Sequence, residues 1–310
     1  MKHSIKITLI LLGMFLLAQF IGLLVINSYN PHSIEVKNEN GTLTNSTTYN
    51  LPYGMGPPEG STPNSNFISI IIALIIAICI MFLLMKFGAQ TFLRTWFFVV
   101  IILALAITIN APLSIFAKYS SSIALLIALP LAYLKVFKRN ILVHNITELF
   151  IYPGIAAIFV PLLNIWTIII LLIIISLYDM WAVWHSGVMQ KMAKYQIKTL
   201  KIFSGFFIPY LGKKERELVN QAKLSKSSKL KNKNIKVNLA ILGGGDIIFP
   251  MILSGVVLRT LDWQHALLIP FGALLGLAYL FYSSEKGKFY PAMPFITIGC
   301  FIALAIVYLI

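Results

Sequence analysis

Apolar residues run along this chain in long unbroken stretches, without the alternation of a half-buried strand or the one-sided stripe of a surface helix. Stretches of this length match a bilayer, whose hydrocarbon core takes about 20 residues of α-helix. The fold class predicted is therefore an all-α polytopic membrane protein. The pattern predicts nine transmembrane helices, at residues 5–26, 67–85, 94–111, 120–134, 146–163, 164–184, 236–258, 264–282 and 290–310.

The composition disfavours the other classes of protein. Hydrophobic types make up 58% of the 310 residues, charged types only 11%, and the mean hydropathy is +0.85. A water-soluble globule carries roughly 25% charged residues, so a cytosolic enzyme is not expected. The two cysteines, Cys79 and Cys300, lie in apolar segments without a nearby His or Cys. Packing roles are therefore favoured over a disulfide or a metal site.

The net charge of +15 is explained by where the basic residues lie. If the N-terminus is cytoplasmic and the spans alternate, every one of the 25 Lys and Arg except Lys37, Lys118 and Arg259 falls on the cytoplasmic side. This positive-inside bias predicts a cytoplasmic N-terminus and an extracytoplasmic C-terminus. We expect the charge to face anionic lipid of a cell membrane, and we expect no nucleic-acid partner.

Two polar stretches interrupt the spans. An external loop at 27–66 is rich in Asn, Ser, Thr, Gly and Pro, so we expect it to be mobile. It contains glycan acceptor patterns at Asn40 and Asn45. A basic cytoplasmic loop is expected to start as a helix on the membrane surface and to be disordered at 213–233. The chain is thereby divided into a six-span half, this loop and a three-span half, at residues 1–184, 185–235 and 236–310.

Two of the ten acidic residues, Asp179 and Asp246, lie inside apolar spans. A carboxylate within a bilayer costs from about 2.5 to more than 10 kcal/mol, so it needs a partner and usually marks a functional site. Counted along ideal helices, Asp179 lies about 8 Å and Asp246 about 15 Å from the cytoplasmic edge. Neighbouring antiparallel spans can bring both into one cavity that faces the cytoplasm.

Glycine and proline surround the second of these residues. Gly243, Gly244 and Gly245 precede Asp246, and Pro250 follows it. Because Pro250 has no N–H for the carbonyl of Asp246, we expect a bend at that turn. Gly243 lies three residues before Asp246 and therefore on the same helical face, where the lack of a side chain admits a neighbouring helix closely. A packing seam alone would explain the glycines, but it would not explain an Asp within the seam.

Two carboxylates in a confined, poorly solvated site share one proton, because repulsion and desolvation oppose the ionisation of both. An aspartyl hydrolase requires this state. The ionised carboxylate takes a proton from a water that attacks an amide carbon, while the protonated one donates to the carbonyl oxygen, giving a gem-diol. Such chemistry needs no metal or cofactor.

Three short motifs resemble those of a known family. Tyr178–Asp179 in one span and the Gly-Gly-Gly-Asp run at 243–246 in the next resemble the YD and GxGD motifs of the intramembrane aspartyl proteases, the presenilin and signal peptide peptidase family. The Pro-Ala-Met run at 291–293 is similar to the Pro-Ala-Leu motif of that family, with Met in place of Leu. The predicted topology is similar to that of presenilin, and the small size suggests a microbial homologue.

The resemblance implies an intramembrane aspartyl endopeptidase that hydrolyses peptide bonds of transmembrane helices, with no metal or cofactor. It implies that Asp179 and Asp246 are the catalytic pair. The other implied residues line the active site (Tyr178, Gly243, Gly244 and Gly245) or bind substrate (Pro291, Ala292 and Met293). Apart from the resemblance, Tyr178 is equally typical of interfacial packing, and Pro291 of an ordinary helix start.

The substrate helix must unwind before its carbonyls can be attacked. Each unpaired main-chain group in lipid costs several kcal/mol, so the enzyme has to pair with the unwound segment. We expect the chain near 291–293 and the cytoplasmic start of the seventh span to pair with the substrate as an added strand.

Two other functions are open on the residues alone. One is a cation or proton transporter that uses the two Asp as a relay. The other is a prepilin-peptidase-like protease, which also uses a GxGD motif. A transporter usually has symmetric halves with paired broken helices, whereas this chain shows one interrupted span and no internal repeat. Expected partners are therefore transmembrane substrates and lipid, and the pattern favours no particular oligomeric state.

Overall fold

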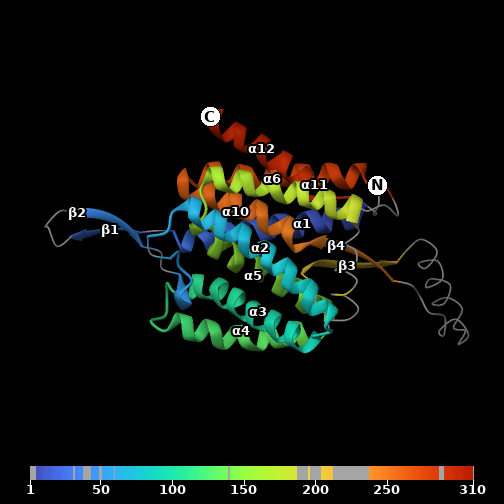
Figure 1. Cartoon of the computed structure of the whole chain (residues 1–310), viewed down its shortest axis with the longest axis horizontal. Helices are drawn as coiled ribbons and strands as arrows, with labels where there is room; N and C mark the ends of the chain where they lie inside the picture. Colours follow the sequence, from blue (N-terminus) through green and yellow to red (C-terminus); the bar gives the residue numbers. More distant parts are fainter. Residues whose placement is uncertain are drawn as a thin grey trace, which may run out of the picture.

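The computed structural model describes residues 5–30, 32–37, 43–48, 51–58, 60–138, 140–186, 195, 204–211, 237–285 and 290–309. The described chain forms a bundle of long helices that run side by side, with a β-hairpin at each end (Figure 1). The long helices are α1 Ile5–Ser28, α2 Pro63–Lys86, α3 Gln90–Leu113, α4 Ser120–Phe137, α5 Ile141–Phe159, α6 Ile165–Trp181, α10 Gly244–Thr260, α11 Trp263–Ser283 and α12 Met293–Leu309. The shorter helical turns are η1 Pro52–Gly54, η2 Val160–Leu162 and η3 Ala182–Ser186.

The predicted helical membrane class is confirmed. By length and hydropathy, seven of the described helices can cross a bilayer, namely α1 to α6 and α11. The remaining two, α10 and α12, have 17 residues each. The amphipathic helix and the disordered stretch that we expected in the basic loop fall outside the described residues, as does Asn40.

Polar side chains cap several helices at the points where the apolar runs begin. Thr62 at α2 and Asn164 at α6 each form a reciprocal capping box with the third residue of their helix. The side chains of Asn140 at α5 and Asp262 at α11 also accept main-chain N–H groups of the first turn. Because these N–H groups have no partner within the helix, the caps define where each helix starts.

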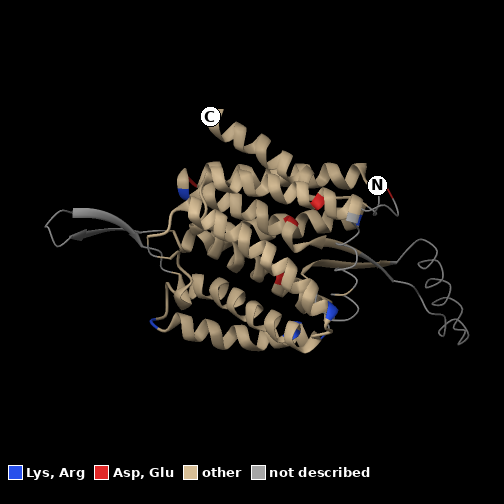
Figure 2. Cartoon of the chain, in the orientation of Figure 1, with Lys and Arg blue, Asp and Glu red and all other residues tan. Residues whose placement is uncertain are grey.

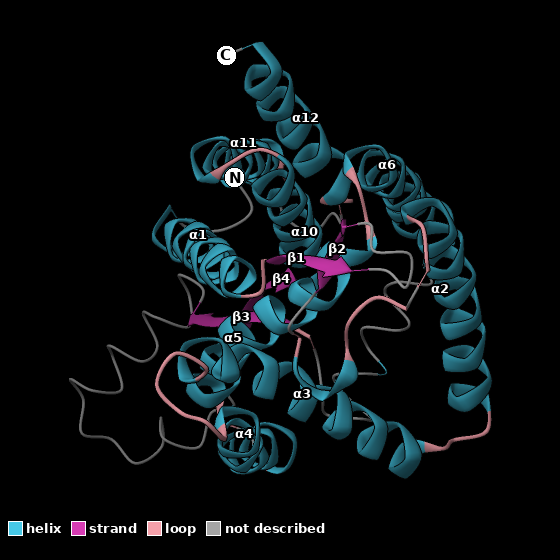
Figure 3. Ribbon diagram, turned by 90° about the vertical axis from the view of Figure 1, so that its left-hand side faces the viewer, coloured by secondary structure: helices cyan, strands magenta, loops and turns pink. Residues whose placement is uncertain are grey.

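Helix α10 lies at the centre of the bundle. It contacts α1, α5, α6, α11 and α12, and most of its residues are buried. Viewed along the bundle, α2 lies at the periphery, next to α3 and α6 (Figure 3). No residue of α2 is buried. The helix that carries Asp246 is thus the most enclosed of the bundle.

Glycines allow two helix pairs to pack at backbone contact. A Cβ at Gly154 of α5 would overlap the carbonyl oxygen of Ala104 in α3. In the same way, Gly272 of α11 and Gly299 of α12 face each other's carbonyl oxygens. Small residues that admit close backbone approach are typical of helix packing in membranes, where dispersion contacts hold helices together.

Both hairpins depart from the sequence prediction. Strands β1 His32–Lys37 and β2 Leu43–Thr48 pair antiparallel, with His32 opposite Thr48, inside the loop that we expected to be mobile. The expected mobility of the loop stays a prediction, but the sequence did not predict these two strands. Both contain β-branched residues, which favour an extended backbone, and a hairpin needs only local pairing.

The second hairpin corrects the start of the seventh span. Strand β4 Val237–Gly243 pairs antiparallel with β3 Gly205–Leu211, with Gly205 opposite Gly243, and α10 begins only at Gly244. The prediction of one helix over 236–258 is therefore wrong for Val237–Gly243. An apolar run is compatible with either structure, and here pairing with a segment distant in sequence selects the strand.

Candidate active site

Asp246 lies where β4 passes directly into α10. Gly243 is the N-cap residue and has an extended backbone, with φ −65° and ψ 146°. Asp246 is the third helical residue, and its carboxylate accepts a hydrogen bond from the main-chain N–H of Gly243. This arrangement is half of a capping box, and it places the acidic group at the positive end of the helix dipole. The strand–helix junction therefore holds the carboxylate in place.

The junction changes the roles expected of the glycines. Gly243 is not on a helical face with Asp246, because it precedes the helix, so our interpretation of Gly243 as a helix-packing residue is wrong. Gly244 is the point of close approach, since a Cβ there would lie 2.5 Å from Ser204 Oγ and 3.0 Å from a ring carbon of Tyr152. Gly245 is exposed, and a Cβ would meet only Phe249 at ordinary distance. Asp246 also lies in the first turn of α10, not ten residues into a helix.

Asp179 lies in the last turn of α6 and is 8% exposed. Its Oδ2 accepts a hydrogen bond of 3.1 Å from the main-chain N–H of Met293, and its carboxylate also interacts with the N–H of Ala292. These are the first main-chain donors of α12, so Asp179 caps that helix from a neighbouring one. The Pro-Ala-Met run is thereby brought to the acidic residue, with Pro291 and Met293 buried.

The two carboxylates are close enough for a direct electrostatic interaction. They reach this position because the end of α6 and the starts of α10 and α12 converge, and these three helices contact one another. One turn away from Asp179, Ser176 and Thr297 share a hydrogen bond of 2.8 Å, which ties α6 to α12. Figure 2 shows that acidic positions, coloured red, are sparse along the helices of the bundle. The structure thus brings together the two Asp that the sequence singled out.

Tyr178 lies at the edge of this site. Its side chain is 37% exposed, and its ring centroid is 6.3 Å from that of Trp181, which is also exposed. Tyr178 lies near enough to Asp179 for the two groups to interact. This position combines both expectations for Tyr178, contact with the acidic residue and packing at the bundle surface.

Two buried residues near Asp246 were missed by the sequence analysis. Gln19 of α1 is fully buried, and its Nε2 donates a 2.8 Å hydrogen bond to the carbonyl of Ile247, next to Asp246. Tyr152 of α5 is also fully buried, with its ring beneath Gly244. An amide in the middle of the first apolar run was the available signal for Gln19, whereas an aromatic residue in a span gives no such signal.

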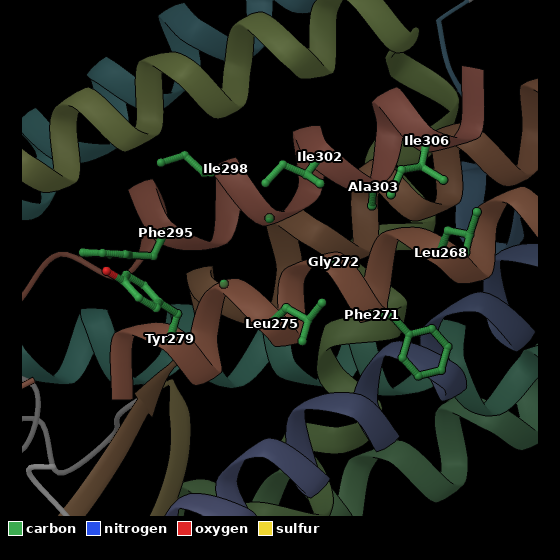
Figure 4. Close-up of a pocket in the computed structure, with 12 residues that line it drawn as sticks. Leu268, Phe271, Gly272, Leu275, Tyr279, Phe295, Ile298, Ile302, Ala303 and Ile306 are labelled. Atoms are coloured by element: carbon green, nitrogen blue, oxygen red, sulfur yellow. The ribbon is translucent and has the colours of Figure 1, made fainter. Parts of the chain in front are cut away.

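An open groove of the described chain lies elsewhere, between α11 and α12. The groove has a volume of about 490 Å³, and Figure 4 shows apolar side chains along it. Tyr279 and Phe295 lie together at one end, with ring centroids 6.0 Å apart. No carboxylate lines this groove, so it is separate from the acidic pair. Within the described residues there is also no cluster of three or more metal-ligating side chains.

The fold and the site define a polytopic membrane protein with an acidic pair enclosed between helix ends. The family model of signal-peptide peptidase and presenilin aspartyl proteases matches residues 53–310, and the chain belongs to that family. It is an intramembrane aspartyl protease, so neither a transporter nor a prepilin-peptidase-like enzyme is favoured. The resemblance seen in the sequence is confirmed.

Solved structures show the same fold. A presenilin family intramembrane aspartate protease in space group C222 superposes with a TM-score of 0.61 at 17% identity, covering 97% of this chain and 98% of that one. A presenilin family intramembrane aspartate protease in space group P2 gives a TM-score of 0.60 at 18% identity, covering 96% of each chain. A search of curated proteins found no match.

Proposed function

We propose that Asp179 and Asp246 are the catalytic pair that hydrolyses peptide bonds of transmembrane helices. The observation that carries this proposal is the convergence of both carboxylates at the meeting point of α6, α10 and α12. One carboxylate removes a proton from the attacking water, and the other donates its proton to the substrate carbonyl oxygen. The protonated carboxylate then donates to the amide nitrogen while the ionised one takes a single proton from the gem-diol, so the C–N bond breaks to give a carboxylic acid and an amine, and the pair again holds one proton. Asp179 and Asp246 thus accept or donate each proton that moves in the reaction.

The neighbours of the pair have supporting roles in this proposal. The N–H groups of Ala292 and Met293 orient Asp179, while Gly243 orients Asp246. Gly244 lets the junction approach Tyr152 and Ser204, and Gly245 leaves the exposed side of the junction open to substrate. Tyr178 lines the lipid-facing edge, where a substrate helix would enter.

The experiment that tests the proposal is titration of the purified protein with a peptide mimic that carries a hydroxyl at the scissile carbon. Such a mimic resembles the gem-diol and binds across both carboxylates. We expect tight binding that drops by about a hundredfold or more when either Asp is replaced by Ala, measured by competition with a labelled mimic. Undiminished binding to both variants would refute the assignment. A liposome assay that shows ion flux without peptide cleavage would instead support a transporter.

We also propose that the substrate adds a strand to the free edge of β4. In β3, both main-chain groups of Phe207 bond to the side chain of Asn145, on the side away from β4. Phe207 is opposite Ile241, so by the alternation of an antiparallel ladder the N–H and C=O of Ile241 point away from β3. The described sheet has only these two strands. The open edge of β4 leads directly to Asp246, and a substrate paired there is delivered to the carboxylates.

We further propose that all nine long helices cross the membrane, with the N-terminus in the cytoplasm. Seventeen residues of helix, as in α10 and α12, span about 26 Å, close to the hydrocarbon thickness of about 30 Å. The described Lys and Arg lie at the ends of the bundle (Figure 2). Apart from Lys37 in the hairpin strand β1, those at the end with the N-terminus are Lys6, Lys86, Arg94, Lys135 and Lys138, and those at the other end are Lys118 and Arg259.

This orientation is tested by labelling with a membrane-impermeant thiol reagent. A cysteine placed at Ser204 should react only from the cytoplasmic side, and one placed at Thr260 only from the opposite side, because positive charge is retained in the cytoplasm. Chains with Cys79 and Cys300 replaced by Ser provide the background. The reverse pattern of labelling would invert the proposed topology.

A further inference from the structure

One face of α5 binds strand β3, which pairs with β4 beside the junction of β4 and α10. Asn145 Nδ2 donates to the carbonyl of Phe207 over 2.7 Å, and the N–H of Phe207 donates to Asn145 Oδ1 over 2.9 Å. His144 Nε2 lies 2.8 Å from the carbonyl oxygen of Gly205. The ring of His144 also packs on that of Phe207, with centroids 4.9 Å apart. The side chains of Asn145 and His144 therefore bind main-chain groups of β3 that a neighbouring strand would otherwise bind.

These contacts are connected to Asp246 through the ladder. Gly205, held by His144, is opposite Gly243, the N-cap of α10 whose N–H binds Asp246. The main chain of Gly244 also donates to the carbonyl of Ser204, beside Gly205. A strand has a two-residue period, so a shift of β3 by one residue would turn every side chain of the hairpin to the opposite face. Fixing β3 on α5 thus fixes where α10 begins.

A buried ion pair braces this face of α5. Lys135 Nζ of α4 lies 2.5 Å from Glu148 Oε1 of α5, and the two side chains are 3% and 1% exposed. His144 Nδ1 lies 3.4 Å from the same ammonium group. Removing a charge pair from water costs more than its attraction commonly returns, and apolar residues would pack as well. The pair therefore points to a requirement for exact placement of α5 against α4, not for added stability.

Tyr152 extends the same face towards the junction, two turns beyond Asn145 along α5. Its ring meets that of Phe206 edge-on, with centroids 5.6 Å apart, and it also contacts Gly244. Its buried hydroxyl lies near Glu148 and Ser204 but has no hydrogen-bond partner among the described residues. In the end-on view, α5 lies directly beside β3 (Figure 3). One helix face thus contacts β3, the ion pair and the start of α10.

We propose that Asn145 and His144, braced by the Lys135–Glu148 ion pair, are positioning residues that set Asp246 in the geometry needed for catalysis. They act through β3 and β4 and do not touch the reacting atoms. The inference rests on the proposed role of Asp246.

The test compares two Asn-to-Leu variants in the full-length purified enzyme with a helical peptide substrate. Asn145→Leu removes both bonds to Phe207, and we expect kcat to fall about tenfold or more with KM within about twofold, because a small misplacement of a catalytic group is costly. Affinity for the hydroxyl-bearing mimic should fall in parallel with kcat. Asn110→Leu, in α3, removes an amide that likewise makes two hydrogen bonds, here to the side chains of Tyr29 and Ser121, and Ser121 lies at the end of α4 opposite Lys135. It should lower the thermal midpoint yet keep the parental kcat.

Asn145→Asp keeps the acceptor for the N–H of Phe207 and loses the donor, so we expect a kcat between those of the parent and Asn145→Leu. If Asn145→Leu does not fold, the kcat of Asn145→Asp tests the proposal in its place. Parental kcat and mimic affinity in the folded Asn145 variants would overturn the proposal, as would an equal loss of kcat in Asn110→Leu. Failure of the proposed function is distinguishable, because Asp246→Ala would then cleave at the parental rate.

Discussion

Replacing either Asp179 or Asp246 by Asn is expected to lower the rate of peptide cleavage by at least about 10³-fold while the helical bundle stays folded. Each carboxylate has its own proton-transfer task, and an amide can neither accept the proton of water nor donate the proton of a carboxylic acid. Asn at 179 still offers an oxygen to the N–H of Met293, so the cap on α12 is retained. The measurement is single-turnover cleavage of a transmembrane reporter in liposomes.

The chain offers a matched control in its third aspartate. Asp262 is exposed and caps α11, where the N–H of His265, followed by the His265 side chain, lowers the pKa of the Asp262 carboxyl. It is therefore a charged cap and not a proton donor. Asp262→Asn should cleave at the parental rate. Cleavage at the parental rate by Asp179→Asn or Asp246→Asn would contradict the proposed catalytic pair.

Replacing Ile241 by Pro is expected to lower kcat/KM for helical substrates by about tenfold to a hundredfold, through loss of one main-chain donor on the substrate-binding edge. The N–H of Ile241 points away from β3, so proline removes no bond of the β3–β4 ladder. Proline is tolerated on edge strands for this reason. The measurement is steady-state cleavage together with the thermal midpoint, which should change little.

Two further variants separate the lost donor from other causes. Ile241→Ala keeps the N–H and removes only a side chain that is 39% exposed, so it should retain most of the activity. Leu242→Pro interrupts the ladder opposite Phe206, and it should impair folding as well as cleavage. If Ile241→Pro and Ile241→Ala have equal kcat/KM, the substrate does not pair with this edge of β4.

The membrane class and the approximate helices could be predicted because both depend on local sequence. The eighth span, predicted at 264–282, is helix α11 at Trp263–Ser283, and the fourth, predicted at 120–134, continues to Phe137 as α4. A helix satisfies its own main-chain groups, so a long apolar run is enough to indicate it. Strand β4 could not be recognised in this way, because its partner β3 lies beyond a long intervening segment.

The residues of the candidate site also fall into those that could be predicted from the sequence and those that could not. Asp179 and Asp246 could be found in the sequence because a carboxylate within an apolar span is costly wherever its partner is. Asn145, His144 and Glu148 lie near the predicted membrane edge, where polar residues are ordinary, and their contacts join segments that are far apart in the sequence. Periodicity and motif spacing carry no trace of such contacts.

The amino-acid sequence by itself determined that this chain folds within a membrane, roughly where its helices lie, and which two acidic side chains call for an explanation. Only the tertiary structure decided that Asp246 follows a strand and that Asp179 receives the first N–H groups of α12. The physical reason is the distance along the chain over which each interaction acts. Transfer of a residue into lipid depends mainly on that residue and its immediate neighbours, whereas pairing of strands and capping across helices depend on the whole bundle.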